Sequence, residues 1–265
     1  MLQLTKKYPR KRAFITGAAS GLGRALALQL AADGWTIGIT DLSRELLQPV
    51  TAEIERHGGK TRLYAFDVSR REKFQEAAAK FLAAEGGIDL LINNAGVGDG
   101  GQFHTYDLER WDWIIGINQM GVIYGCHYFL PVMRQAKSGH IINIASAAGF
   151  AYAPAVSGYN VTKAAVNALS ETLYHECRPL GVRVSVVMPT FFKTNIIQGW
   201  RGSERSRKAA EQLVNNSGLE AETVAAKVLK QAGRGHFRIV LPFRARFLYF
   251  MVRFFPRLYR RTFRF

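Results

Sequence analysis

A tyrosine, a lysine and a serine are spaced so that they can share one proton-transfer site. Tyr159 and Lys163 are four residues apart, so a helix through them would place both side chains on one face. The lysine charge would favour the ionised phenol, whose ordinary pKa of about 10 is too high for a base at neutral pH. Ser146 ends an apolar run upstream and offers a hydroxyl to the substrate oxygen. These residues indicate alcohol and carbonyl chemistry. The pair alone is weak evidence, because about half of one such pair arises by chance and an exposed helical pair is the alternative.

The body of the chain alternates short apolar runs with longer segments, such as 21–33 and 75–85, that carry apolar residues at helical spacing. This alternation is typical of a parallel sheet, and right-handed crossovers place the helices on both of its faces. We predict an α/β fold in which a Rossmann-type doubly wound parallel sheet forms a single domain, residues 12–241. The expected strands are 13–16, 36–40, 61–66, 88–93, 140–145, 183–188 and 237–241.

The 265 residues carry a formal net charge of +16, and most of it lies at the two ends. Residues 1–11 are expected to form a basic N-terminal arm, and residues 242–265 a basic, aromatic tail. The only cysteines, Cys126 and Cys177, lack metal-ligand spacing, which predicts reduced thiols and no metal site. We expect a cytoplasmic protein, because the sequence shows neither a signal peptide nor an apolar run of membrane-spanning length.

Residues 16–23, TGAASGLG, lie between the first expected strand and a helix. Glycines there let the backbone approach a pyrophosphate, and the helix N-terminus offers free N–H groups. This context favours a nucleotide site over an ordinary strand-to-helix turn. Asp41 ends the second strand, where a carboxylate binds a ribose 2′-hydroxyl and repels a 2′-phosphate, so NAD is favoured over NADP. Arg44 nearby keeps NADP possible, and a helix cap is the other interpretation of Asp41.

Residues 10–241 resemble the short-chain dehydrogenase/reductase family in five separate elements. These are the turn at 16–23, Asp67-Val68, Asn93-Asn94-Ala95-Gly96, Asn118, and Ser146 with Tyr159 and Lys163. Pro189 with Thr194 also resembles the family's nicotinamide-carboxamide loop. The family usually has glycine after this proline, whereas this chain has Thr190, which leaves the conformation of the loop open.

The resemblance implies roles for these residues. Tyr159 would donate or accept the proton, Lys163 would lower its pKa and bind the nicotinamide ribose, and Ser146 would orient the carbonyl. Asn118 would hold a water in the proton relay, with a polar side chain at a helix kink as the alternative. The implied catalytic residues are Asn118, Ser146, Tyr159 and Lys163. The implied cofactor-binding residues are Thr16, Gly17, Ser20, Gly21, Leu22, Gly23, Asp41, Asp67, Val68, Asn94, Ala95, Gly96, Tyr159, Lys163, Pro189 and Thr194.

The family also implies a homodimer or homotetramer, paired through helices near 121–135 and 158–178, and a mobile substrate lid at about 190–215. Aromatic residues in and near this lid suit a lipophilic alcohol or ketone, although a place in the core or at a subunit interface is equally compatible. The expected substrate residues are Ser146, Phe150, Tyr152, Phe191, Phe192 and Trp200.

The tail is the part that the family resemblance explains least. Arg246, Arg253, Arg257, Arg260, Arg261 and Arg264 fall within about 100° of a helical projection, with mainly Phe, Leu, Met and Val elsewhere. Pro256 should divide the helix in two. We expect the tail to rest on an anionic membrane surface without crossing it. A subunit-packing or core-covering role, an acidic protein and nucleic acid are the alternatives, nucleic acid being the least favoured.

The sequence therefore predicts an NAD(P)-dependent oxidoreductase that interconverts a secondary alcohol and a ketone, or an alcohol and an aldehyde, on a lipophilic substrate. One alternative is an NADP-dependent carbonyl or 3-oxoacyl reductase that uses a carrier-linked substrate. The alternative without catalysis is a nucleotide-binding redox sensor or membrane-surface module. The Tyr159 and Ser146 pattern disfavours it, because binding alone requires neither residue.

Overall fold

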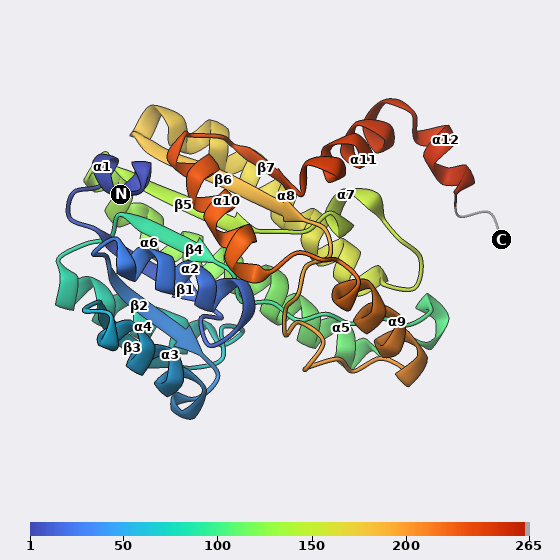
Figure 1. Ribbon diagram of the computed structural model, residues 1–265, viewed down its shortest axis with the longest axis horizontal. Helices are drawn as coiled ribbons and strands as arrows, with labels where there is room; N and C mark the ends of the chain where they lie inside the picture. Colours follow the sequence, from blue (N-terminus) through green and yellow to red (C-terminus); the bar gives the residue numbers. More distant parts are fainter. Residues whose placement is uncertain (263–265) are drawn as a thin grey trace.

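Seven parallel strands form one sheet at the centre of the molecule (Figure 1). The computed structural model spans residues 1–265, and residues 1–262 are described. The strand order is β3, β2, β1, β4, β5, β6, β7, and each neighbouring pair runs parallel. The order reverses between β1 and β4, which defines a doubly wound sheet and confirms the predicted fold class. The strands are β1 (Arg12–Thr16), β2 (Thr36–Asp41), β3 (Lys60–Ala65), β4 (Leu90–Asn93), β5 (Gly139–Ile144), β6 (Val182–Pro189) and β7 (Arg238–Leu241).

Helices cover both faces of the sheet, and a separate hydrophobic core lies under each layer. Successive strand residues point to opposite faces, so Phe14 enters one core and Ile15 the other. The Ile15 side is covered by α2 (Gly21–Ala32), α3 (Arg44–Arg56) and α10 (Ala221–Gly233). The Phe14 side is covered by α4 (Arg71–Glu85), α6 (Gly121–Gln135) and α8 (Ser157–Cys177).

Shorter helices and turns connect the strands and the long helices. The helix α5 (Leu108–Ile115) continues through a π-helical turn (Gly116–Met120) into α6. The other elements are 3₁₀ turns at Phe103–Thr105 and Arg178–Leu180, and the helices α7 (Ala148–Ala151) and α9 (Glu204–Asn215). Because α7 follows β5 directly, it lies at the carboxyl ends of the strands, where α/β proteins place their sites.

The basic segment 1–11 is integrated with the domain. Residues Gln3–Lys7 form α1, which packs beside α10. Leu4 and Tyr8 are buried, and the Tyr8 hydroxyl donates to the Gly139 carbonyl oxygen at 3.1 Å. Apolar burial therefore decides the position of this segment, although its charge suggested an arm.

The tail folds into α11 (Phe243–Phe254) and α12 (Pro256–Arg261), which project beyond the body next to α7 (Figure 1). The chain changes direction at Phe255, as expected from Pro256, which lacks an N–H for a continuous helix. Arg264 lies outside the described residues. Among residues 1–262, no helix combines the length and the apolar character needed to cross a membrane.

Candidate active site

The turn between β1 and α2 is packed too closely for side chains at two of its glycines. A Cβ on Gly17 would lie 2.8 Å from the Cα of Ala95, and one on Gly23 only 2.0 Å from the Gly17 carbonyl oxygen. Gly17 also has a φ of +65°, which favours glycine. Gly17 and Ser20, just before α2, line a pocket in which an anion can approach the start of the helix. Ser20 and Gly21 belong to this turn, whereas the side chain of Leu22 is buried in the core.

Thr16 and Asn94 join the turn to the end of β4. The Thr16 hydroxyl accepts the N–H groups of Asn94 and Ala95, at 2.9 and 3.0 Å. The Asn94 amide donates in return to the carbonyl oxygens of Thr16 and Gly17, both at 2.9 Å. Four hydrogen bonds therefore fix the two loops at the point where the strand order reverses.

A pocket of about 180 Å³ lies in front of this junction. Asp41 reaches it from β2, and its carboxylate accepts the Ala19 N–H of the turn at 3.1 Å. Asp67 accepts the Ser69 N–H at 2.9 Å and lines the opposite wall beside Val68. The pocket lining includes Gly17, Ser20, Asp41, Asp67, Val68, Asn94, Ala95 and Gly96 from the predicted set, and Leu42, Phe66, Val97, Ile117, Asn195 and Ile196 in addition.

Asn118 is buried in the π-helical turn between α5 and α6. Its side-chain oxygen accepts the Val97 N–H at 2.8 Å, and its amide donates to the Val97 carbonyl oxygen at 2.9 Å and to the Thr162 hydroxyl at 3.3 Å. The side chain thus ties an irregular helix turn to the loop after β4 and to α8. Single π turns are frequent at functional sites. Thr162 was not predicted, and no motif in the sequence marks it.

The helix α8 brings Tyr159 and Lys163 beside Ser146, as the i, i+4 spacing predicts. The Lys163 ammonium is 5.7 Å from the centre of the Tyr159 ring and donates to the Ile144 carbonyl oxygen at 3.0 Å. Gly96 touches the same group, because a Cβ there would lie 3.3 Å from Lys163 Nζ. Ser146 accepts the Ala148 N–H at 3.1 Å and lies 3.4 Å from the Pro189 carbonyl oxygen. We call these four residues, Asn118, Ser146, Tyr159 and Lys163, with the turn at 16–23, the catalytic edge.

The pKa of Tyr159 differs from the sequence-based expectation. Burial raises the pKa of the phenol, and its hydrogen bond with Ser146 opposes the rise only in part. Burial also lowers the pKa of Lys163 to about 8. The expected lowering of the tyrosine pKa by the lysine is therefore wrong for the protein alone, because the loss of water on burial outweighs the hydrogen bond with Ser146 and Lys163 is not among the causes of the shift.

Pro189 and Thr194 occupy the start of the expected lid. The Thr190 N–H donates to the Leu241 carbonyl oxygen at 2.8 Å, so the chain remains paired with β7 one residue past Pro189. Thr194 lies against the glycine turn, since a Cβ on Gly21 would be 2.8 Å from the Thr194 hydroxyl oxygen. Threonine at 190 is accommodated by this pairing, and the lid then continues as an irregular segment into α9.

The expected substrate aromatics fall into two groups. Phe192 is buried in the core under α10, and Phe150 packs edge-on against Tyr249 of the tail at 5.0 Å between ring centres. Phe192 therefore forms no open wall, whereas Phe150, although nearly buried, lines a hollow of about 650 Å³ together with Tyr152 and Tyr249. Tyr152 and Phe191 are exposed, whereas Trp200 covers the loop at 98–100.

A buried charge cluster that carries no sequence motif supports this same loop. Asp99 is almost fully buried and accepts two hydrogen bonds from Arg110, at 2.8 and 2.9 Å. The Tyr106 hydroxyl donates to the same carboxylate at 2.7 Å. Together, Arg110 and Tyr106 neutralise and fix Asp99 under Trp200. Sequence reasoning missed the cluster, because Asp99 and Tyr106 lie in an irregular loop and only Arg110 belongs to a helix, α5.

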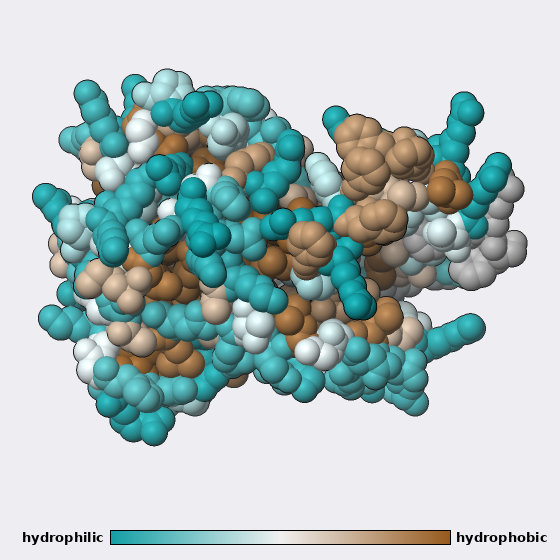
Figure 2. Space-filling view, turned by 45° about the horizontal axis from the view of Figure 1, so that its top comes forward, coloured by the Kyte–Doolittle hydropathy of each residue, from teal (hydrophilic) through white to brown (hydrophobic). Residues whose placement is uncertain are grey.

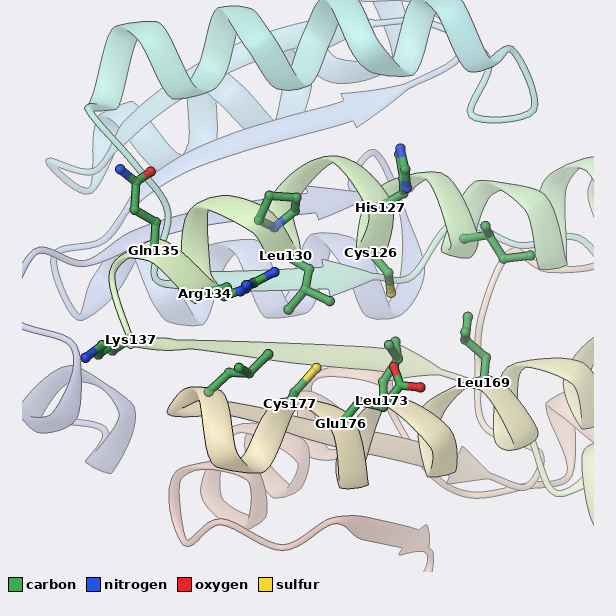
Figure 3. A pocket seen from close by; sticks show the side chains of 13 residues that line it. Cys126, His127, Leu130, Arg134, Gln135, Lys137, Leu169, Leu173, Glu176 and Cys177 are labelled. Atoms are coloured by element: carbon green, nitrogen blue, oxygen red, sulfur yellow. The ribbon is translucent and has the colours of Figure 1, made fainter.

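A larger hollow, of about 840 Å³, lies away from this chemistry between α6 and α8. Figure 3 shows Cys126 and Leu130 of α6 pointing across the gap toward Leu173 and Cys177 of α8. Burial raises the pKa of the Cys126 thiol to about 12, so it stays protonated. The hollow is mainly apolar and contains none of the predicted catalytic or cofactor-binding residues.

Comparison with known proteins agrees with the geometry of the catalytic edge. Residues 11–205 match the family described as short chain dehydrogenase. The chain therefore belongs to the short-chain dehydrogenase family, and the resemblance seen in its motifs is confirmed.

Two curated relatives are named oxidoreductases. The probable oxidoreductase EphD of Mycobacterium tuberculosis (strain H37Rv) is 35% identical over 184 residues, which are 69% of this chain and 31% of that protein. An uncharacterized oxidoreductase of Staphylococcus aureus (strain USA300) is 32% identical over 219 residues, which are 83% of this chain and 89% of the relative. The chain thus spans about a third of the mycobacterial protein and most of the staphylococcal one.

Two solved structures with a similar fold hold a nicotinamide dinucleotide. A short-chain dehydrogenase/reductase from Burkholderia phymatum, in complex with NAD, superposes with a TM-score of 0.83 at 32% identity, covering 87% of this chain and 88% of that one. A metagenomic short-chain oxidoreductase in complex with NADP gives a TM-score of 0.73 at 32% identity, covering 88% and 96%.

Proposed function

We propose that the protein is an NAD(P)-dependent oxidoreductase that interconverts an alcohol and a carbonyl group. The observation that carries this proposal is the meeting of Ser146, Tyr159 and Lys163 beside a dinucleotide-type turn. Family membership and the two nicotinamide-bound relatives support it.

The residues at the β1–α2 turn fit a dinucleotide. The space that a Cβ on Gly23 would fill and the N-terminus of α2 match a pyrophosphate. The carboxylate of Asp41 matches a ribose. The Lys163 ammonium lies beside Gly96, where it can donate a hydrogen bond to a ribose hydroxyl. When bound, the nicotinamide group supplies or takes up the hydride.

The protein's own part in the reaction is to position the substrate oxygen and to move a proton. The contact in which the Ser146 hydroxyl donates to the Pro189 carbonyl oxygen is long, at 3.4 Å, so its proton can turn toward a substrate oxygen. Tyr159 is protonated at neutral pH because burial raises its pKa, and it therefore enters carbonyl reduction as the proton donor. Alcohol oxidation requires the phenolate instead, so this direction should accelerate as pH increases.

The position of Asp41 favours NAD. Its carboxylate lies at the pocket end of β2, where it can accept a hydrogen bond from a 2′-hydroxyl and repel a 2′-phosphate. We infer a lipophilic substrate from the half-exposed rings of Tyr152 and Phe191 and from Trp200 on the neighbouring loop. We also propose a homodimer or homotetramer, paired over the apolar hollow between α6 and α8 (Figure 3).

The test is turnover of the purified protein with NAD and with NADP across lipophilic and small polar alcohols and ketones. Tyr159→Phe should lower kcat/KM by about a thousandfold while cofactor binding persists, because only the transferable proton is lost. Tyr64→Phe, on the edge strand β3, is the matched control and should retain activity. Unchanged turnover in Tyr159→Phe would refute the tyrosine mechanism. A clear preference for small polar ketones would refute the lipophilic substrate.

A further inference from the structure

The outward side of α11 exposes a row of phenylalanines. Phe243, Phe247, Phe250 and Phe254 recur at intervals of four, three and four residues, which places them on one side of the helix. We call these four residues the phenylalanine ridge. Their exposed fractions are 77, 68, 47 and 64%. Phe255 and Leu258 continue the apolar surface toward α12, at 49 and 52%. Such a contiguous exposed patch marks an interaction surface.

The opposite side of the tail is already occupied by the core. Ala245 is buried, and Leu248, Tyr249 and Val252 pack against the core on the Phe14 side of the sheet, where α11 adjoins β7 and α7. The Tyr259 hydroxyl donates to the Ala151 carbonyl oxygen of α7 at 2.6 Å. These contacts fix the rotation of α11, so the phenylalanine ridge points outward, and a hollow of about 650 Å³ lined by Tyr249, Val252 and Arg253 remains on the inner side.

Arginines border the ridge on both sides. At about 100° per residue, Arg246 and Arg253 lie on one side of it and Arg244 lies on the other. Residues 243–262 contain six arginines and no acidic residue, and none of the six pairs with a carboxylate among the described residues. Figure 2 shows the apolar surface of this projection, with hydrophilic side chains at its margins. The sequence-based projection gathered the arginines within about 100° and left the apolar residues elsewhere; the structure shows four of those phenylalanines exposed on the outward side of α11.

We propose that this face of α11 and α12 docks on an anionic membrane surface. Phenylalanine rings enter the boundary between headgroups and acyl chains, and the flanking guanidinium groups bind lipid phosphates bidentately. The bend at Pro256 lets both short helices lie in the plane of the surface. A purely apolar partner would leave the arginines uncompensated, whereas an anionic bilayer satisfies both components at once.

Docking would bring the mouth of the catalytic edge to the bilayer. The lid and the tail leave the adjacent strands β6 and β7, which pair Pro189 with Leu241 in register. The exposed rings of Phe191 and Tyr152 therefore lie near the start and the inner side of the tail. A lipophilic alcohol could pass from the membrane to the site without crossing water. This consequence rests on the proposed function, but the docking itself does not.

The test is sedimentation of the full-length protein with vesicles of phosphatidylcholine alone and with vesicles in which about a third of the lipid is phosphatidylglycerol. Binding should require the anionic lipid and weaken in high salt. The double variant Arg253→Glu with Arg257→Glu should lower the partition coefficient at least about tenfold. Arg56→Glu with Lys60→Glu changes the net charge equally on the distant α3 and β3, and it should retain binding.

A second set of variants tests the contribution of the phenylalanine ridge to vesicle binding. Phe247→Ser with Phe254→Ser should also lower the partition coefficient at least about tenfold. Leu46→Ser, at a comparably exposed position on α3, should not. Circular dichroism and cofactor binding check that each variant is folded. Equal binding by tail and control variants, or no binding by the full-length protein, would overturn the proposal. If the serine variants instead dissociate an oligomer in sedimentation equilibrium and vesicles are not bound, the ridge is an interface between copies.

Discussion

The catalytic edge and the tail lie at the same end of the sheet, but they are stabilised in opposite ways. At the catalytic edge, Asn118 and Lys163 are buried, and each polar group is satisfied by a backbone group from another element. In the tail, only one side of α11 is packed, and its largest rings face outward. The candidate site is thus held by enclosed polar contacts, whereas the tail keeps an exposed apolar surface.

The largest effect on stability should come from Arg110→Met. Removing the guanidinium leaves the Asp99 carboxylate buried without its ion partner, which should lower the free energy of unfolding by about 3–5 kcal/mol. Urea unfolding measures this change. Arg207→Met is the control, because Arg207 pairs with Glu204 at 2.9 Å on the exposed surface of α9 and should cost less than about 1 kcal/mol. Similar losses in both variants would contradict the contrast between enclosed and exposed contacts.

Lys163 should make stability depend on pH. Its pKa is lower in the folded protein, at about 8, than the ordinary lysine value, so the folded state releases this proton first. The free energy of unfolding should therefore rise between about pH 8 and 10.4, by up to roughly 3 kcal/mol. Lys163→Met should lack this increment, and Lys60→Met on the exposed edge strand should keep it. Parallel stability profiles for Lys163→Met and the unmodified protein would show that burial of the ammonium is not the cause.

Asp41→Ala should change cofactor preference more than stability. Without the carboxylate, a 2′-phosphate is no longer repelled, and the ratio of kcat/KM for NADP to that for NAD should increase about tenfold. Steady-state kinetics with both cofactors measures the ratio. Glu45→Ala, four residues further along the chain in the first turn of α3, is the matched removal of a carboxylate. An unchanged ratio in Asp41→Ala would mean that the Asp41 carboxylate only accepts the Ala19 N–H and does not select between the two cofactors.

The smallest effect should follow substitution in the phenylalanine ridge. Phe247→Ser removes an exposed ring and should alter the free energy of unfolding by less than about 0.5 kcal/mol. Tyr249→Ser, two residues away on the packed side, removes the contact with Phe150 and should cost about 1–3 kcal/mol. Thermal unfolding distinguishes the two. Equal losses would mean that the ridge also supports the fold.

Sequence reasoning succeeded where the signal is local. The glycines at 16–23 need no distant partner to be recognised, and Tyr159 with Lys163 follows from helix geometry alone. It missed Asp99 with Arg110, because their contact depends on how an irregular loop folds back on α5. The basic charge of residues 1–11 predicted an arm, whereas the burial of Leu4 and Tyr8 fixes this segment against the domain. In the tail, the inner partners of α11 determine which side faces outward, and those partners come from distant segments.

The π-helical turn around Asn118 has a consequence for insertions and deletions. The helical run from α5 to α6 holds one residue more than regular α-helical spacing would allow across that turn. Loss of a single codon within residues 116–120 would remove the extra residue and let the run close into an ordinary helix, with both flanking halves in place. The reading frame downstream of a three-nucleotide deletion would survive, yet Asn118 would leave Val97. Length along this stretch of the gene is therefore constrained as strictly as the identity of the asparagine itself.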